Sequence, residues 1–274
     1  MTGEDIERIE IDLLLEGIYQ TYGYDFRSYA RASVDRRVRQ FAAKSGIEKI
    51  SEMIPRTIHD KEFFSKLAHY FSVSVTEMFR DPFVFLEIRH EVLPSLHSYP
   101  FFKVWHAGCA TGEEVYSLAI LLQEEKLLER ATIYATDFNE EVLEQARKGI
   151  YPLSRMKDYT SNYQEAGGSR SFSEYYHARY DSAAISDNLK RRITFACHNL
   201  AADGVFGEIH LVFCRNLLIY FNRDLQNRAL GLFTDSLVRG GYLCLGTSES
   251  LEFSDVKRCY ELVDKKAKIY RKVR

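Results

Sequence analysis

One stretch of the chain, Phe102–Ala119, constrains the fold more than any other; it reads FKVWHAGCATGEEVYSLA. Aromatic and β-branched residues at its start predict a short buried strand, because such side chains fit a pleated surface. Gly108 and Gly112 follow, and a glycine lets the backbone turn tightly and approach a ligand closely. Glu113 and Glu114 then open an apolar-periodic run that is typical of a helix, whose N-terminus favours acidic residues. This order of strand, glycine loop and helix indicates a nucleotide-binding α/β unit.

A second β-rich run, residues 131–136, ends directly before Asp137. An acidic residue at this place can accept hydrogen bonds from ribose hydroxyls, which dinucleotides and S-adenosylmethionine both carry. Glu113 and Glu114 would repel the pyrophosphate of a dinucleotide. A carboxylate suits the cationic amino group of a methionine moiety, so the pattern favours S-adenosylmethionine over NAD. The plain structural alternative is a strand–turn–helix unit that binds no ligand.

Length, charge and cysteine usage limit the classes of protein that fit. The 274 residues allow one large or two small domains, and the net charge of −2 gives no signature of nucleic-acid binding. The N-terminus is polar and acidic and no long apolar run follows, so we expect a cytoplasmic protein without membrane insertion. The five cysteines are scattered without C-x-x-C spacing, which argues against a disulfide framework and against a metal site.

Periodicity divides the chain into regions of different character. Residues 1–80 predict an N-terminal helical domain with a basic helix near 26–44, and 81–100 are expected to be a linker. Residues 101–274 alternate strands with helices, which predicts a mainly parallel sheet. Within them, 151–190 fit neither pattern and predict a small inserted subdomain. We expect strands near 102–107, 131–136, 193–197, 209–214, 241–246 and 267–272, helices near 113–126, 139–147 and 223–238, and a closing antiparallel hairpin over 260–271.

Polar residues follow two further strands of the predicted sheet. Arg215 and Asn216 come directly after an apolar strand, at the edge where open α/β sheets bind ligands. The alternative is that both merely cap the next helix. Asn199 and Leu200 follow another strand, in the place where an adenine would lie. Ahead of the sheet, the run Thr76–Arg80 brings a positive charge to the domain junction, although Thr76 could also be a simple helix N-cap.

Five blocks together resemble the CheR family of chemoreceptor glutamate O-methyltransferases, from about Phe26 to Tyr270. The blocks are TEMFR at 76–80, WHAGCATGEEVYS at 105–117, ATD at 135–137, HNL at 198–200 and CRNLLIYF at 214–221. The resemblance implies a class I S-adenosylmethionine-dependent methyltransferase with a Rossmann-like α/β fold. In this fold, a mainly parallel sheet has an antiparallel C-terminal edge, and an N-terminal all-helical domain and a small inserted subdomain are added to it.

The resemblance also implies roles for single residues. Arg80 and Tyr220 would lie at the methyl-transfer site, and Ser74 stands where some relatives have a cofactor-contacting asparagine. Glu113 would hold the methionine end of the cofactor and Asp137 its ribose. The full cofactor-binding set implied in this way is Ser74, Thr76, Arg80, Glu113, Asp137, Asn199, Leu200, Arg215 and Asn216.

The basic helix is the expected partner surface. Residues 27–49 carry seven basic side chains against two acidic ones, and Arg36 and Arg39 share a helix face with Arg37 on its flank. By itself this run is typical of a solvated helix face. The resemblance implies instead that it binds the glutamate-rich cytoplasmic helical domain of chemoreceptors. A monomer is the default expectation, and the net charge predicts no nucleic-acid partner.

Other functions stay open at this level. The alternatives are a CheR-like methyltransferase acting on another signalling protein, a methyltransferase for a small molecule or nucleic acid, and a non-catalytic S-adenosylmethionine-binding module.

Overall fold

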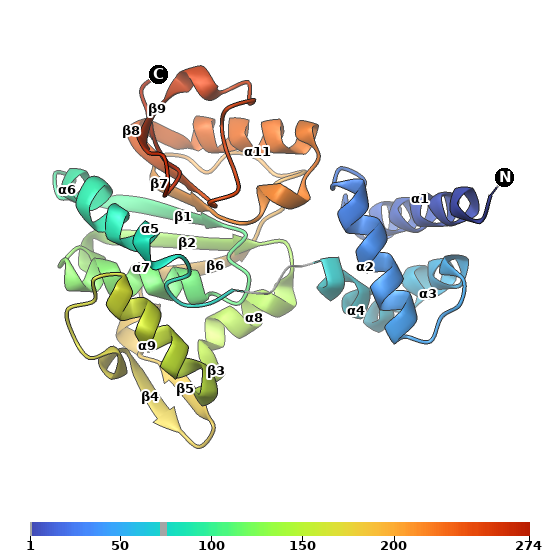
Figure 1. Cartoon of the computed structure of the whole chain (residues 1–274), viewed down its shortest axis with the longest axis horizontal. Coiled ribbons are helices and arrows are strands. Elements are labelled where there is room, and N and C mark those ends of the chain that lie inside the picture. The colour runs from blue at the N-terminus through green and yellow to red at the C-terminus, as the bar shows by residue number, and fades with distance from the viewer. Residues whose placement is uncertain (1, 72–75) are drawn as a thin grey trace.

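The computed structural model describes residues 2–71 and 76–274, which form a small helical domain and a larger α/β domain (Figure 1). The helical domain begins with α1 (Gly3–Tyr22), where Thr2 and Asp5 form a reciprocal capping box. α1 ends at Gly23, whose φ of 76° suits a residue without a side chain. The helices of this domain pack around one apolar core. Its other elements are α2 (Arg31–Lys44), η1 (Ile50–Glu52), α3 (Met53–His59) and α4 (Lys61–Phe71).

The segment that was expected to be a linker, residues 81–100, is helical and packed. It forms α5 (Pro82–Glu87), the π-helical turn η2 (Ile88–Val92) and α6 (Leu93–Leu96). Their apolar side chains belong to the same buried cluster as the first strand of the sheet. The short periodic runs were too brief to be recognised from the sequence, and tertiary burial stabilises them. This segment is therefore part of the α/β domain.

A seven-stranded sheet forms the centre of the α/β domain, in the order β6-β2-β1-β7-β8-β10-β9. The first five strands in this order are parallel, while β10 is antiparallel to both β8 and β9. The predicted fold class, a mainly parallel sheet with an antiparallel C-terminal edge, is confirmed. The strands are β1 (Phe102–Ala107), β2 (Ala131–Asp137), β6 (Ile193–Cys197), β7 (Ile209–Cys214), β8 (Leu237–Leu245), β9 (Tyr260–Asp264) and β10 (Ile269–Lys272).

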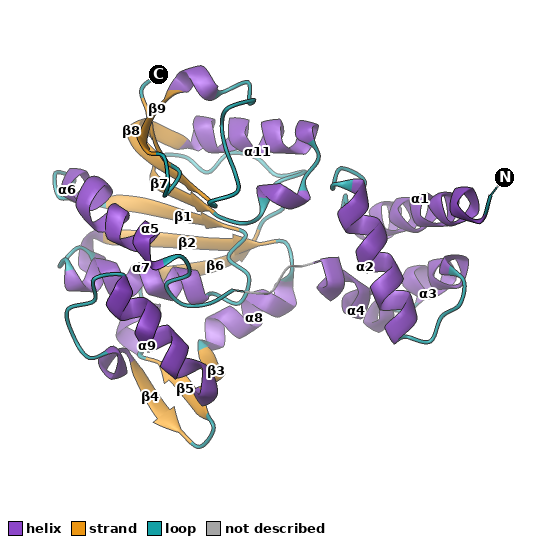
Figure 2. Cartoon of the chain, in the orientation of Figure 1, coloured by secondary structure: helices purple, strands orange, loops and turns teal. Residues whose placement is uncertain are grey.

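Helices cover both faces of this sheet (Figures 1 and 2). Successive residues of a strand point to opposite faces, so Val104 packs into the cluster beneath α7 and Trp105 into the cluster beneath α11. α11 ends at Ser236, and β8 starts four residues before the expected 241. The remaining helices of the sheet domain are α7 (Glu113–Glu124), η3 (Leu128–Arg130), α8 (Glu140–Lys148), α10 (Asp187–Lys190), η6 (Leu218–Tyr220), α11 (Arg223–Ser236) and η7 (Lys257–Cys259).

The inserted subdomain is a separate three-stranded antiparallel sheet with the order β3-β5-β4. Buried tyrosines of its helix and turns, Tyr159, Tyr163 and Tyr175, pack it against the main domain. This explains why the region is rich in tyrosine and lacks the periodicity of the larger sheet. Its elements are β3 (Ile150–Pro152), η4 (Leu153–Arg155), α9 (Met156–Glu165), η5 (Phe172–Tyr175), β4 (Tyr176–Arg179) and β5 (Ser182–Ile185).

Among residues 2–71 and 76–274, no helix is both long and apolar enough to cross a bilayer. Across the same described ranges, no group of three or more His, Cys, Asp or Glu side chains could hold a metal ion.

Candidate cofactor and catalytic site

The glycine loop between β1 and α7 has a backbone that needs its glycines. Gly108 and Gly112 have φ angles of 76° and 89°, which a residue with a Cβ adopts only with strain. A Cβ on Gly108 would lie 2.6 Å from Leu217, and one on Gly112 would lie 2.9 Å from Ala146. The amides of Gly108 and Cys109 both donate to the Thr136 carbonyl, at 2.8 and 2.9 Å. The loop is therefore folded closely over the end of β2.

Asp137, at the end of β2, is joined directly to this loop. Its carboxylate accepts from the Ala110 amide at 3.0 Å and from the Asn139 amide at 3.0 Å. Burial raises the pKa of Asp137 to about 6, while these amides oppose the rise. The group is still ionised at neutral pH, so its carboxylate can accept hydrogen bonds from hydroxyl groups.

A cavity opens between the two domains, beside the loop and Asp137. The helical side contributes Tyr29 and Phe71, and Arg80 comes from the segment that joins the domains. The sheet domain contributes Asp137, at the end of β2, and residues that follow β1, β2, β6 and β7. The side chains and main chain lining the cavity belong to Tyr29, Phe71, Thr76, Arg80, Gly108, Cys109, Ala110, Glu114, Asp137, Phe138, Val142, His198, Asn199, Leu200, Ala201, Arg215, Asn216, Leu217, Tyr220, Phe221 and Leu225.

Most of the residues singled out in the sequence meet in this cavity, from segments far apart along the chain. Ser74 lies outside the residues that the structure describes. Glu113 is described but does not line the cavity. The predicted residues that do are Thr76, Arg80, Asp137, Asn199, Leu200, Arg215, Asn216 and Tyr220.

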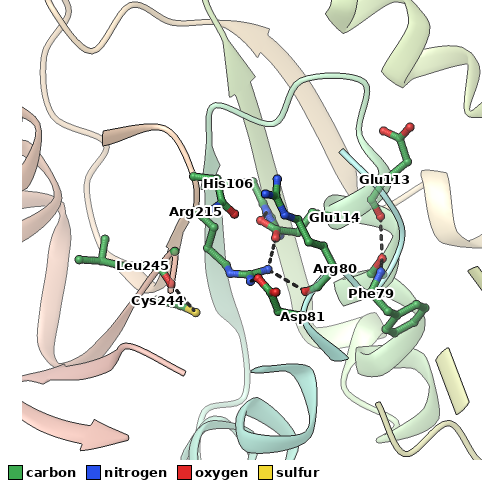
Figure 3. A network of polar contacts seen from close by, with 12 residues as sticks. Phe79, Arg80, Asp81, His106, Glu113, Glu114, Arg215, Cys244 and Leu245 are labelled. Atoms are coloured by element: carbon green, nitrogen blue, oxygen red, sulfur yellow. Dashed lines mark hydrogen bonds and ion pairs between the residues drawn. The ribbon is translucent and has the colours of Figure 1, made fainter. Parts of the chain in front are cut away.

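Glu113 was expected to reach the cofactor, but the neighbouring residue Glu114 occupies the position beside the cavity. Successive helix residues are about 100° apart, so only one of Glu113 and Glu114 can face the cavity, and Glu114 does. In Figure 3 the Glu113 carboxylate points away from Arg215, whereas Glu114 points toward it. Glu113 is buried and accepts a hydrogen bond from the Thr111 hydroxyl at 2.6 Å. Burial raises its pKa to about 7.

Arg215 also differs from expectation, since its side chain is 0% exposed. The part of this residue that reaches the cavity is therefore main chain. The guanidinium pairs with Asp81 at 2.6 Å and with Glu114, and it donates to the Arg80 carbonyl at 3.1 Å (Figure 3). Two carboxylates compensate one buried cation, which is the condition under which a buried charge is stable. Arg215 thus ties the Arg80 region to the start of α7.

The residues Met78–Asp81, here called the Arg80 segment, have an unusual backbone. Phe79 and Asp81 both have a φ of 54°, in the left-handed region. Such strain persists only where surrounding contacts fix it. The Phe79 amide donates to the Ser117 hydroxyl at 2.8 Å, and the Asp81 carbonyl accepts from the Val84 amide at 2.8 Å. Arg80 is held between two fixed neighbours.

Tyr220 lies where the helical domain contacts the sheet domain. The Ala30 amide donates to the Tyr220 carbonyl at 2.8 Å, and Tyr29 forms an isolated β-bridge with Phe221. The Arg37 guanidinium lies over the Tyr220 ring, 4.8 Å from its centre. Arg37 was predicted to lie on the partner-binding surface, and this prediction is wrong because its side chain is buried.

Arg37 is 9% exposed because it supports the fold of the helical domain. Its guanidinium donates to the carbonyls of Tyr70 and Phe71, both at 2.7 Å, at the end of α4. Arg36 and Arg39 are exposed on the same helix. The sequence pattern grouped the three arginines as one partner surface, with Arg37 on its flank, whereas packing buries Arg37 and leaves the other two exposed.

Sequence reasoning missed Glu249, a buried carboxylate that organises the loop after β7. It accepts hydrogen bonds from the amides of Gly246 at 2.6 Å, Asn216 at 3.1 Å and Ile219 at 3.3 Å. Asn216 has a φ of 59°, so these bonds hold a strained loop that carries Asn216 and Tyr220. An acidic residue three positions after the glycine that closes an apolar strand is the signal that was available.

The cavity fits an adenosyl compound. Asp137 offers an ionised carboxylate to a ribose, and the glycine loop brings the main chain of Gly108, Cys109 and Ala110 to the cavity wall. Phe138, Val142 and Leu200 supply an apolar wall for a flat base.

Comparison with known proteins assigns the two domains to one family. Residues 74–269 match the family model described as CheR methyltransferase, SAM binding domain, and residues 9–72 match CheR methyltransferase, all-alpha domain. A Pseudomonas putida protein named Cher3, provisionally assigned as a methyltransferase, is 50% identical over 99% of this chain and 100% of its own length. A chemotaxis protein methyltransferase of Listeria innocua is 29% identical, over 84% of this chain and 85% of its own. Chemotaxis protein methyltransferase 1 of Vibrio cholerae is 29% identical over 80% of both.

Proposed function

We propose, from the premise that this chain belongs to the CheR methyltransferase family and is an S-adenosylmethionine-dependent methyltransferase, that its substrates are glutamate side chains of chemoreceptors. The product would be a glutamate methyl ester, and the activity would serve adaptation in chemotaxis signalling. The main observation behind this proposal is the cavity between the two domains, because Arg80, Tyr220 and Asp137 all line it. Because the proposed substrate is the cytoplasmic part of a receptor, we also expect the enzyme to act in the cytoplasm.

The cavity residues would divide the work of binding. Asp137 would accept from the ribose hydroxyls, and Asn199 and Leu200 would border the adenine. Thr76 and the main chain of Arg215 and Asn216 would complete the wall, with Glu114 as its acidic residue beside the glycine loop. Glu113 would act from behind the loop rather than on the cofactor, because its carboxylate is turned to Thr111.

The chemistry needs orientation more than proton transfer. When bound, S-adenosylmethionine supplies a methyl group on a positively charged sulfur. A glutamate carboxylate is already ionised at neutral pH, so no residue has to remove a proton. The reaction forms a bond between the carboxylate oxygen and the methyl carbon and breaks the carbon–sulfur bond, whose electron pair stays on sulfur. Arg80 and Tyr220 would hold the carboxylate oxygens in line for this transfer.

Exposed basic residues of α2 support the choice of a glutamate-rich partner. Arg36 and Arg39 are exposed on α2, where Arg39 pairs with Glu7 of α1, and exposed arginines would steer a glutamate-rich helix by charge complementarity. Arg37 no longer belongs to this proposed surface, since it is buried under the end of α4.

A radiolabel assay tests the proposal. The protein would be incubated with tritiated S-adenosylmethionine and a cytoplasmic chemoreceptor fragment from the same cell. We expect label on the receptor that mild alkali releases, as carboxyl methyl esters require, and at least about 100-fold less label with Arg80→Ala. Alkali-stable label, or label that Arg80→Ala leaves unchanged, would contradict the proposed chemistry. Label on a different signalling protein, or cofactor binding without any transfer, would assign one of the alternative functions.

A further inference from the structure

The inserted subdomain contacts the Arg80 segment through residues that do not line the cavity. The Asn162 side-chain amide, on α9, donates to the Met78 carbonyl at 3.0 Å. The ring of Phe79, 1% exposed, lies 5.3 Å from the ring of Tyr163 and 6.3 Å from that of Phe172. One subdomain therefore fixes both the carbonyl and the side chain that precede Arg80.

The same subdomain also contacts the glycine loop. The Tyr151 hydroxyl, on β3, donates to the Thr111 carbonyl at 2.7 Å, and Tyr151 is 5% exposed. A Cβ on Gly112 would meet this hydroxyl at 3.4 Å. Tyr159 and Arg155 lie close enough to the buried Glu113 to lower its pKa against the larger effect of burial. The loop is thus backed by β3, η4 and α9.

A third contact fixes the subdomain relative to α7. Glu124, near the end of α7, has a side chain that is 2% exposed and pairs with Arg89 at 2.6 Å. It accepts hydrogen bonds from the hydroxyls of Tyr163 and Tyr175, the latter at 3.0 Å, and from the Ser169 amide at 3.2 Å. α7 begins at the glycine loop, which Tyr151 contacts, and ends at Glu124. The subdomain therefore contacts the chain at both ends of this helix.

From these contacts we propose that the inserted subdomain is a positioning element of the methyl-transfer site. Asn162 acts through Met78 to set the place of Arg80, and Tyr151 acts through Thr111 to set the glycine loop. Both are positioning residues, because neither lines the cavity. The inference rests on the proposed function for the role of Arg80. It goes beyond that function by giving the subdomain a part in turnover.

Hydrogen exchange tests the Asn162 contact without any substrate. Three full-length proteins would be compared: wild type, Asn162→Ala and Lys157→Ala, an exposed position of the same helix. We expect amide exchange in residues 79–81 to be at least about tenfold faster in Asn162→Ala, because these amides depend on the bracing of the segment. Lys157→Ala should exchange like wild type. Equal exchange in all three proteins would overturn the inference, whatever the receptor assay shows.

A double-mutant cycle then tests whether Asn162 acts through Arg80. We expect Asn162→Ala to lower kcat about tenfold, while the Kd for S-adenosylhomocysteine changes less than about threefold. In an Arg80→Ala background, Asn162→Ala should cause no further loss. An equal tenfold loss in that background would show that Asn162 acts elsewhere and would overturn the proposal.

Tyr151→Phe is the matched test for the glycine loop. It removes only the hydroxyl that donates to Thr111, and we expect the Kd for S-adenosylhomocysteine to rise about threefold to tenfold. An unchanged Kd would remove Tyr151 from the proposal. If the wild-type protein labels no receptor, the proposed function fails, and the exchange and binding results still decide this inference.

Discussion

At the scale of single residues, three buried carboxylates near the site are held in three ways. Glu249 accepts from several backbone amides, Asp137 from two loop amides, and Glu113 from the Thr111 hydroxyl. Hydrogen bonds to an ionised carboxylate lower its pKa, and burial raises it. The pKa of Glu113 accordingly rises to about 7 and that of Asp137 to about 6. Asp137 is thus the better ionised of the two that the sequence singled out.

Glu113 should make the stability of the ligand-free protein depend on pH. Its pKa is higher in the folded than in the unfolded state, so the folded state loses stability as pH rises from about 4.5 to about 7. Glu113→Gln removes this titration. We expect the variant to gain about 1–3 kcal/mol over wild type at pH 8 relative to pH 4.5, measured by urea unfolding at both values. A constant difference between the two proteins across this range would contradict the raised pKa.

Arg215 should be more important for folding than a cofactor contact would be. Arg215→Ala leaves Asp81 and Glu114 without their shared cation, and we expect it to lower the free energy of unfolding by about 3–5 kcal/mol. Chemical denaturation measures this loss. Adding Asp81→Asn should restore part of it, because one uncompensated charge is then removed. A loss of less than about 1 kcal/mol would mean that the network contributes little.

At the scale of elements, the sequence predicted what local patterns encode. The strand–glycine loop–helix unit, Asp137 and the antiparallel edge follow from periodicity and turn chemistry, and the structure has them. Whether Glu113 or Glu114 faces the cavity depends on helix phase, and a start shifted by one residue changes the answer by about 100°. The buried surroundings of the Arg37 and Arg215 side chains could not be predicted, because distant carbonyls and carboxylates, which no local pattern reveals, surround their charges.

The exposed face of α2 gives a prediction about receptor capture. Arg36→Glu with Arg39→Glu should raise the KM for receptor at least about tenfold at low salt, with the Kd for S-adenosylhomocysteine unchanged within about twofold. The matched control is Arg258→Glu with Lys265→Glu, which changes the net charge equally at other exposed positions. An equal effect of both pairs would point to net charge instead of the α2 face. Arg37→Glu should instead destabilise the helical domain.

At the scale of the whole molecule, the site exists only where two domains meet. Tyr29 and Phe71 of the helical domain face Asp137 and Asn216 of the sheet domain across the cavity. Two backbone hydrogen bonds join the domains there, from Ala30 to Tyr220 at 2.8 Å and from Asn222 to Ser28 at 2.9 Å. The relative placement of the domains therefore sets how Tyr29 and Phe71 lie against the sheet-domain residues of the cavity.

Ala30→Pro tests this dependence by removing one donor. The φ of Ala30 is −57°, which proline adopts without strain, but proline has no N–H for the Tyr220 carbonyl. We expect kcat/KM to fall about tenfold, in keeping with the loss of a hydrogen bond worth about 1 kcal/mol plus the displacement of Tyr220. Ala30→Ser, which keeps the N–H, is the control. Similar activity of both variants would show that this bond does not set the geometry.

The composite wall of the cavity has a consequence for inhibitor selectivity. One half of the cavity comes from the sheet domain, whose glycine loop and acidic strand end are general features of nucleotide-binding α/β folds. The opposite half includes Tyr29 and Phe71, which belong to the helical domain. An adenosine analogue extended toward Tyr29 and Phe71 would address side chains that an enzyme built from the sheet domain alone does not possess. Medicinal chemistry that aims to spare other methyltransferases would therefore start from the helical side of the pocket.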